Sequence, residues 1–231
     1  MPGLFSTSSA FAHPQIRTFA HLLLSLLMDT KVTTIIFDLG GVLIDWNPRY
    51  VYRSIFDDEE KIDWFFETIC TSEWNETQDE GRSLQEGTEE LVAKYPEYEK
   101  EVRAYYGRWE EMLGGPITGT VEIFRTLKGK NKFKFYALTN WSAETFPVAV
   151  ERYDLLKWFD GIVMSGEERT RKPFPEIFQI LLNRYNIKAS ESLFIDDSLR
   201  NIKGAQAVGI RGIHFQSPQQ LSEELTKFGI V

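Results

Sequence analysis

The chain of 231 residues carries a formal net charge of −8, and 42% of its residues are hydrophobic while 26% are charged. These fractions exclude an intrinsically disordered chain, and the length allows one large domain or a core with a smaller inserted domain. The negative charge argues against nucleic acid and anionic membranes as partners. The single cysteine, Cys70, permits no intrachain disulfide and fits a reducing compartment, so we expect a cytoplasmic protein.

The first 30 residues differ from the rest, because they contain no acidic side chain before Asp29. The apolar stretch from Leu22 to Met28 is too short to span a bilayer, and it lacks the basic region and cleavage site of a secretory signal. We therefore interpret residues 1–30 as an amino-terminal extension. It is either disordered, a weak targeting segment, or a stretch upstream of the natural start, for which Met28 is the alternative first residue.

The run from Val32 to Phe37 is apolar and rich in β-branched residues, which predicts a parallel strand buried on both faces. Asp38 follows it directly, at the strand end where open α/β sheets bind their ligands. Gly40 and Gly41 then allow a sharp turn and a close approach of the backbone to a ligand. Taken alone, the stretch fits an ordinary strand and turn equally well.

Residues 48–116 show the apolar spacing of amphipathic helices and no convincing strand. Gly114–Pro116 interrupts the helical pattern, which is typical of the end of a helical segment and of a hinge. We predict that residues 48–116 form a helical cap, inserted into a core made of residues 31–47 and 117–231.

From Val121 onward, strands and helices alternate. This alternation implies a parallel sheet with helices on both faces, and hence an α/β fold with a Rossmann-like core and an inserted helical cap. The further predicted strands are Phe133–Leu138, Gly161–Met164, Ser192–Ile195 and Ile210–Phe215. The helices between them are Val121–Leu127, one capped by Ser142, one opening at Pro175, one from Leu199 and one opened by the capping box at Ser217.

Polar side chains stand where several of these apolar runs end. Because the carboxyl ends of parallel strands share one edge of a sheet, we expect these side chains to converge. Each alone also has a structural explanation, as a turn, a helix cap or a solvated surface charge. The residues concerned are Asp38, Thr139, Asn140, Asp196 and Asp197, together with Lys172 from the loop after the third strand.

This set of residues suits nucleophilic displacement at phosphorus. Its three carboxylates repel one another, and Mg²⁺, which prefers oxygen ligands, would relieve that repulsion. Lys172 adds a compact positive charge for a carboxylate or a phosphoryl oxygen, while Thr139 and Asn140 supply hydrogen-bond donors. A carboxylate that is free to attack forms a covalent intermediate.

The stretches FDLGGVLID, YALTN, TRKPFP and FIDDSLRNIKGA, in this order, resemble the four motifs of the haloacid dehalogenase superfamily of hydrolases. The predicted helical insertion is similar to the small cap of the subfamily that holds haloacid dehalogenases and many sugar-phosphate phosphatases. The resemblance implies that Asp38 is the nucleophile and that Lys172 pairs with it and with the phosphoryl group. It also implies that Thr139 and Asn140 hold the transferring group.

The same resemblance implies a magnesium site and a substrate pocket. Trp141 follows the second motif and Gly41 lies in the first, so we expect both to line the pocket. Trp46, beside the first motif, either lines the pocket or packs against the cap, and packing is the preferred interpretation. Trp109 is expected to be a core or cap contact. The implied ligands of Mg²⁺ are Asp38, the carbonyl oxygen of Gly40, Asp197 and, directly or through water, Asp196.

One position departs from the family pattern. Phosphatases of the superfamily usually carry a second aspartate two positions after the nucleophile, where it protonates the leaving oxygen, and here that position is Gly40. General acid–base assistance is worth about 10²–10⁴-fold in rate. Another proton donor, a good leaving group or a slow reaction would account for the difference. Asp45 is one alternative donor, and a structural or exposed role is the other interpretation of this residue.

We therefore predict a Mg²⁺-dependent phosphatase of a small phosphorylated metabolite, acting through an aspartyl-phosphate intermediate. The alternatives are a haloacid dehalogenase that uses the same aspartate, and a catalytically weakened binding protein of this fold. The acidic pair Asp196 and Asp197 favours the phosphatase, because dehalogenases of this family need no metal and generally lack that pair. Whether the protein is a monomer or a dimer is left open.

Overall fold

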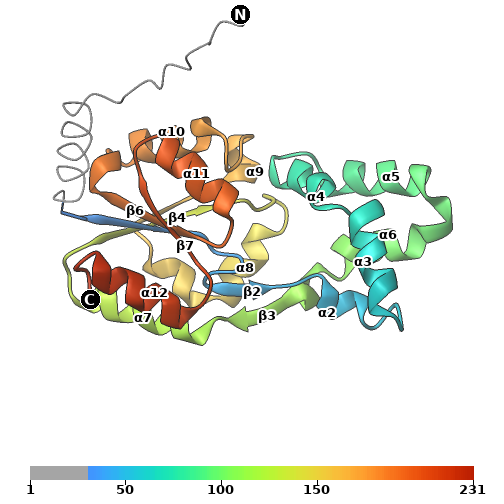
Figure 1. Ribbon diagram of the computed structural model, residues 1–231. Helices are drawn as coiled ribbons and strands as arrows, with labels where there is room; N and C mark the ends of the chain where they lie inside the picture. Colours follow the sequence, from blue (N-terminus) through green and yellow to red (C-terminus); the bar gives the residue numbers. More distant parts are fainter. Residues whose placement is uncertain (1–30) are drawn as a thin grey trace, which may run out of the picture. The chain divides into compact units, whose positions relative to one another are not determined.

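The computed structural model describes residues 31–231, so the predictions for residues 1–30 lie outside the described residues. Five parallel strands form the central sheet, in the order β5-β4-β1-β6-β7 (Figure 1). They confirm the five predicted strands. Their bounds are β1 (Thr34–Phe37), β4 (Lys134–Thr139), β5 (Gly161–Met164), β6 (Ser192–Asp196) and β7 (Arg211–His214).

The first strand of the chain lies at the centre of the sheet. β1 pairs with β4 on one side and with β6 on the other, so that Phe37 lies opposite Ala137 and Ile195. β5 extends the sheet beyond β4, and β7 extends it beyond β6. Open α/β sheets bind ligands where the strand order reverses in this way, outside the carboxyl ends of the strands. This edge is therefore the place to look for a site.

Helices cover both faces of the sheet, as predicted. Because side chains alternate along a strand, Ile35 and Phe37 of β1 pack on one face and Ile36 packs on the other. Burial of each such side chain stabilises the fold by about 1.5–3 kcal/mol. Figure 1 shows the helices in two layers: α7 (Thr118–Gly129) and α12 (Pro218–Lys227) in one, α10 (Pro175–Arg184) and α11 (Leu199–Ala207) in the other.

The helix after β4 begins later than predicted. Ser142 does not cap α8, which starts only at Phe146; its hydroxyl accepts the N–H of Glu144 at 3.2 Å within a turn instead. Serine makes the same bond in turns and at caps, so the sequence does not separate the two. At α12 the predicted cap is present, because Ser217 Oγ accepts the N–H of Gln220 at 3.2 Å. The short elements of this part are α8 (Phe146–Arg152), η3 (Asp154–Trp158), α9 (Ser165–Glu168) and η4 (Ala189–Glu191).

A helical insert, residues 48–112, lies beside the sheet (Figure 1). Aromatic rings form its centre: the ring of Tyr52 lies 5.0 Å from Phe65 and 6.4 Å from Tyr105, measured between centroids. No helix within residues 31–231 has both the length and the apolar character needed to cross a membrane. The helical segments are α2 (Arg49–Tyr52), α3 (Glu59–Thr68), α4 (Ser72–Asp79), α5 (Leu84–Lys94), η1 (Pro96–Tyr98), α6 (Glu99–Gly107) and η2 (Trp109–Met112).

An antiparallel ribbon of β2 (Ile44–Trp46) and β3 (Leu113–Pro116) joins the helical insert to the sheet. The helical pattern ends before Gly114–Pro116, as predicted, but these residues pair as a strand, which the sequence analysis did not predict. Glycine and proline are uncommon inside strands, but here Gly114 lets side chains of β2 and α2 lie close to the ribbon backbone. A Cβ at Gly114 would overlap the Asp45 carboxylate. The division into core and cap stays a prediction, because residues 32–231 form one compact unit.

Candidate active site

Lys172 joins two carboxylates at the carboxyl edge of the sheet. Its ammonium nitrogen lies 2.8 Å from Asp38 Oδ1 and 2.7 Å from Asp196 Oδ2. Asp38 directly follows β1, Asp196 ends β6, and Lys172 comes from the loop between α9 and α10. The Lys172 side chain is 1% exposed and that of Asp38 is 11% exposed, so bulk water is largely excluded. Three residues far apart in the sequence thus converge as predicted.

Asp38 has one oxygen bound and the other available. Oδ1 accepts a hydrogen bond from the backbone N–H of Leu39 at 2.7 Å in addition to its contact with Lys172. The Asp38 N–H donates to the carbonyl of Ile195 at 2.8 Å, which fixes its backbone against β6. Within residues 31–231, Oδ2 has no hydrogen-bond partner. A carboxylate held in this way presents its second oxygen to an electrophile.

The neighbouring aspartates of the last motif have different surroundings. Asp196 is fully buried, and its Oδ1 accepts the N–H of Ser198 at 2.8 Å and the amide of Asn201 at 3.0 Å. Its Oδ2 is bound to Lys172. Asp197 is exposed and lines a cleft at the sheet edge. Asp196 therefore anchors the lysine, while Asp197 is the more accessible to a ligand.

Negative charge exceeds positive charge at this edge. Burial raises the pKa of Asp38 to about 8; Lys172 acts to lower it, and the charges of Asp196 and Asp197 act to raise it further. Burial and the charge of Asp196 likewise raise the pKa of Asp197. For Lys172, burial acts to lower the pKa, but the charges of Asp196 and Asp38 outweigh it and raise the pKa. Three carboxylates share one ammonium group.

The three aspartates fit a divalent cation. Asp38, Asp196 and Asp197 each offer a carboxylate oxygen, and these atoms lie within 4.8 Å of one another. An all-oxygen donor set suits Mg²⁺ better than a soft metal. When all three are ionised, one lysine leaves two negative charges, which a divalent ion would cancel. Gly41 makes room for this cluster: its φ is +71°, and a Cβ there would overlap the Asp197 carboxylate.

Asn140 and Thr139 follow one another at the end of β4 but have different contacts. Asn140 Oδ1 accepts the Lys172 N–H at 2.8 Å, and its Nδ2 donates to the Lys172 carbonyl at 3.1 Å. Asn140 thus fixes the lysine backbone, a role that the sequence analysis did not find, since an amide after a strand shows no partner. Thr139 is buried, and its hydroxyl has no hydrogen-bond partner in the described chain. A buried unpaired hydroxyl is unusual, and it is free to donate to a ligand.

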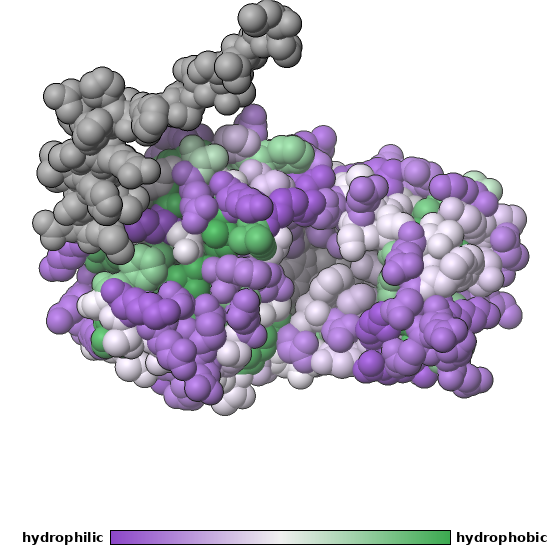
Figure 2. Space-filling view, viewed as in Figure 1, coloured by the Kyte–Doolittle hydropathy of each residue, from purple (hydrophilic) through white to green (hydrophobic). Residues whose placement is uncertain are grey.

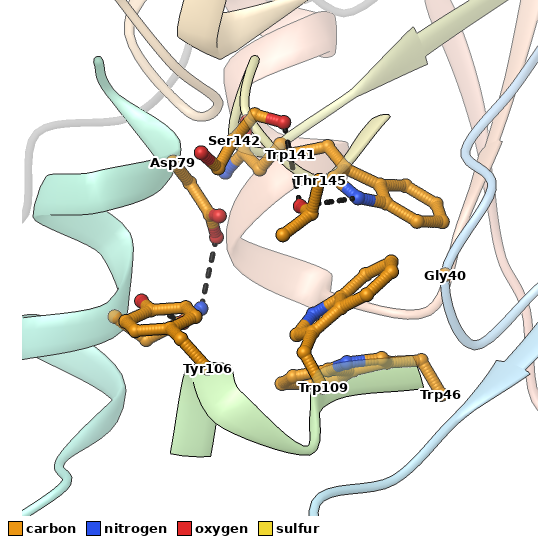
Figure 3. Close-up of a pocket in the computed structure, with 10 residues that line it drawn as sticks. Gly40, Trp46, Asp79, Tyr106, Trp109, Trp141, Ser142 and Thr145 are labelled. Atoms are coloured by element: carbon orange, nitrogen blue, oxygen red, sulfur yellow. Dashed lines mark hydrogen bonds between the residues drawn. The ribbon is translucent and has the colours of Figure 1, made fainter. Parts of the chain in front are cut away.

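A pocket lies between the helical insert and the sheet edge. Figure 2 shows the surface hollowed between these two parts, and Figure 3 shows the side chains around the pocket. Trp141 lines it as predicted, and its ring lies 5.7 Å from that of Trp109 between centroids. Trp46 also lines the pocket, which was the less preferred of its two interpretations, and so does Trp109, which was expected only to pack.

A wider cleft shares residues with this pocket and extends over Asp38, Gly41 and Asp197. Gly41 therefore lies where a substrate-binding residue was predicted. Asp79, at the end of α4, lines both the pocket and the cleft. The sequence analysis did not single it out, because an acidic residue in a polar helix ordinarily lies on a solvated face.

A family model for haloacid dehalogenase-like hydrolases matches residues 32–209. The chain belongs to this family. It is 30% identical over 187 residues to the sesquiterpene phosphatase astK of Aspergillus oryzae, covering 81% of this chain and 91% of that protein. It is 26% identical over 182 residues to a phosphorylated carbohydrates phosphatase of Thermotoga maritima, covering 78% and 83%. The HAD family enzyme bt-2542 of Bacteroides thetaiotaomicron, solved with magnesium and inorganic phosphate, has a TM-score of 0.59 at 24% identity, covering 80% and 95%.

These comparisons confirm the family resemblance and the predicted α/β fold. Both curated relatives are phosphatases by name, which confirms the predicted enzyme class, a phosphatase among the haloacid dehalogenase-like hydrolases. The likeness to bt-2542 shows the fold alone. The roles of individual residues, the metal and the substrate rest on the geometry of the site.

Gly40, the residue at which this hydrolase departs from the family pattern, lies beside open space. A Cβ added to Gly40 would meet no atom within 4 Å, so the structure has room there for a side chain. Asp45, the alternative proton donor, accepts the Tyr50 hydroxyl through Oδ2 at 2.6 Å on the ribbon. It lines neither the pocket nor the cleft. These contacts favour the structural interpretation of Asp45.

Proposed function

We propose that this phosphatase hydrolyses phosphate monoesters through an aspartyl-phosphate intermediate at Asp38, with Mg²⁺ bound beside it. Asp38 Oδ2 attacks phosphorus, the bond from phosphorus to the alcohol oxygen breaks, and water then displaces Asp38 to release inorganic phosphate. The observation that carries the proposal is the buried Asp38, whose Oδ1 is held by Lys172 and the Leu39 N–H while Oδ2 stays available. A nucleophile held in this fixed position raises the reaction rate, because less orientational freedom is lost in reaching the transition state.

The surrounding residues support this role for Asp38. Lys172 acts to lower the pKa of Asp38 against the effect of burial, as a bound Mg²⁺ also would, and it adds positive charge near the phosphoryl oxygens. We assign the unpartnered hydroxyl of Thr139 as a donor to one of those oxygens, and we assign Asn140 to the same group through its remaining amide hydrogen. Asn140 also positions Lys172 through both of its hydrogen bonds.

The proposed Mg²⁺ ligands are those predicted from the motifs. The carboxylates of Asp38 and Asp197 and the carbonyl of Gly40 would contact the ion, and Asp196 would act directly or through water, since its oxygens already accept protein hydrogen bonds. When bound, Mg²⁺ would supply charge stabilisation to the transferring phosphoryl group. The oxygen-only donor set and the excess negative charge support this assignment.

We propose further that the alcohol of the substrate carries an apolar group. The pocket beside the nucleophile is walled by the rings of Trp46, Trp109 and Trp141, and such walls favour apolar ligand groups. The relative astK is named as a sesquiterpene phosphatase, which supports the same class. A sugar phosphate is the competing class, since the Thermotoga maritima relative is named for phosphorylated carbohydrates.

A single set of assays tests both parts of the proposal. Phosphate release is measured from a prenyl monophosphate, a sugar phosphate and p-nitrophenyl phosphate, with Mg²⁺, with a chelator, and after Mg²⁺ is restored. We expect turnover only with Mg²⁺. At about 0.8 kcal/mol per buried methylene, we expect kcat/KM at least about tenfold higher for the prenyl ester than for the sugar phosphate. Halide release from 2-haloacids that persists in chelator would favour a dehalogenase. Release of neither phosphate nor halide from any of these substrates would favour a binding protein.

A further inference from the structure

The reaction proposed above needs a proton for its leaving oxygen, and the usual source is absent. Gly40 has no side chain, and Asp45 is hydrogen-bonded to Tyr50 away from the pocket. An alcohol is a poor leaving group as an alkoxide, so a positioned acid has a large effect on its departure. Some other group in the pocket must provide this proton if simple alcohols are to leave.

Asp79 has the right position for such a group. In the described part of the chain, it is the only carboxyl residue that lines the aromatic pocket. It also lines the wider cleft that contains Asp38, so nucleophile and carboxyl face one continuous space. Figure 3 shows its side chain extending from the end of α4 into the pocket, between Ser142 and Tyr106. The leaving alcohol of a substrate bound at Asp38 would occupy this space.

The contacts of Asp79 are neutral, unlike those of Asp38. Its Oδ2 accepts a hydrogen bond from the Asn75 amide at 2.9 Å, and Asn75 Oδ1 accepts the Tyr106 hydroxyl at 2.9 Å. The nearby Arg171 is paired with Glu76 at 3.0 Å and does not bind Asp79. The Asp79 carboxyl therefore has no cation in direct contact, unlike that of Asp38.

The protonation of Asp79 agrees with this position. Burial and the negative charge of Glu76 raise its pKa to about 7, although the Ser142 N–H, Arg171 and Lys172 act to lower it. A general acid works best when its pKa lies near the working pH. Asp79 therefore carries its proton in a substantial fraction of molecules near neutral pH.

We propose that Asp79 is the catalytic acid and base of the reaction proposed above, from the helical insert in place of a side chain at Gly40. As the bond from phosphorus to the alcohol oxygen breaks, its electron pair stays on oxygen, and this oxygen takes the Asp79 proton. In the second half, the Asp79 carboxylate takes a proton from the attacking water. The bond from phosphorus to Asp38 Oδ2 then breaks, its electrons return to Asp38, and inorganic phosphate leaves with Asp79 again protonated.

A purely structural role for Asp79 makes a different prediction. The end of α4 contacts α9 through the Ser165 hydroxyl, which donates to the Asp79 backbone carbonyl. This anchor does not use the carboxyl group, so Asp79→Asn leaves it in place. The variant also keeps an oxygen that accepts from Asn75. Any loss of activity in Asp79→Asn therefore reports on the proton and charge of the carboxyl group.

The decisive measurement compares two leaving groups in Asp79→Asn. Since kcat/KM covers the steps up to departure of the alcohol, it is measured with an alkyl phosphate and with p-nitrophenyl phosphate, whose leaving phenolate needs little protonation. We expect a loss of about 10²-fold or more for the alkyl ester and a change of only a few-fold for the aryl ester. Asp45→Asn is the matched control, with both values expected to stay near those of the wild type.

A second variant restores the missing group at its usual place. Because Gly40 has open space around a Cβ, Gly40→Asp in the Asp79→Asn background should recover at least about tenfold of the lost alkyl turnover. Equal losses on both substrates, no loss on either, or a double variant as slow as Asp79→Asn would overturn the assignment of Asp79. A wild-type protein that releases phosphate from no ester would instead overturn the proposed function itself.

Discussion

At the sheet edge, Asp38 and Asp196 each lie within 2.8 Å of the Lys172 ammonium, whereas on the helical insert Asp79 has the neutral Asn75 amide at 2.9 Å. The same functional group is therefore placed in two electrostatic settings on the two walls of one cleft. Beside the lysine, a buried carboxylate has a cation in contact that favours its charged, attacking form, against the burial that raises its pKa. Beside an amide, a carboxyl has no cation in contact, so its proton can pass to a leaving oxygen. Environment, rather than residue type, separates nucleophile from acid.

The two walls also differ in what fixes them. The sheet-edge groups lie at strand ends, and backbone N–H groups of Leu39 and Ser198 hold their carboxylates. The opposite wall is made of aromatic rings and of a helix end that reaches the site through tertiary packing. Attack on phosphorus and handling of the alcohol are thus assigned to different segments. Substitutions on the helical insert should alter leaving-group selectivity, and substitutions at the sheet edge should remove turnover altogether.

The largest expected effect is at the nucleophile. Asp38→Asn preserves the size of the side chain and an oxygen that accepts from Lys172 and Leu39, but it removes the attacking carboxylate. We expect kcat for every phosphate ester to fall by at least about 10⁴-fold. Circular dichroism should show an unchanged fold. Retention of more than a few per cent of wild-type activity would show that another residue attacks phosphorus.

A smaller effect, on stability, tests the ion pairs of Lys172. Lys172→Met leaves Asp38 and Asp196 buried without their cation, and breaking a buried pair costs about 3–5 kcal/mol. The matched control is Lys134→Met, because Lys134 pairs with Asp160 at 2.9 Å but its side chain is 68% exposed. Exposed pairs are worth about 0–1 kcal/mol. The free energy of unfolding in urea measures both, and losses of equal size would contradict the buried pairing.

The site residues that could be predicted from the sequence are those that a local sequence pattern marks. Apolar runs that end on polar residues located Asp38 and Asp196 at one sheet edge, because parallel strands impose that convergence. β3 was missed because its pairing with β2 overrides the low strand propensity of glycine and proline. The role of Asp79 was missed because it depends on where α4 packs against the sheet domain. No periodicity within a helix reveals which residue will face a distant nucleophile.

The smallest expected effect again concerns Asp79, through the pH dependence of stability. A carboxyl whose pKa rises from about 3.9 when unfolded to about 7 when folded holds its proton in the folded state while the unfolded chain has lost it. The contribution of Asp79 to wild-type stability should therefore fall as pH rises from about 4 to 7, and level off above that. Asp79→Asn does not titrate, so it should match the wild type near pH 4 and be more stable at pH 8.

The full shift corresponds to about 4 kcal/mol, and because the Asp79 side chain faces a pocket open to solvent, we expect about half of this. Urea unfolding at pH 4 and pH 8 measures the difference. Asp160→Asn is a control of opposite sign: partial burial acts to raise the pKa of Asp160, but the Phe135 N–H and Lys134 lower it. That variant should lose stability at pH 8 and recover relative to the wild type in acid. An Asp79→Asn advantage that is independent of pH would mean that this carboxyl is ionised in the folded protein, which would remove the contrast between the two walls.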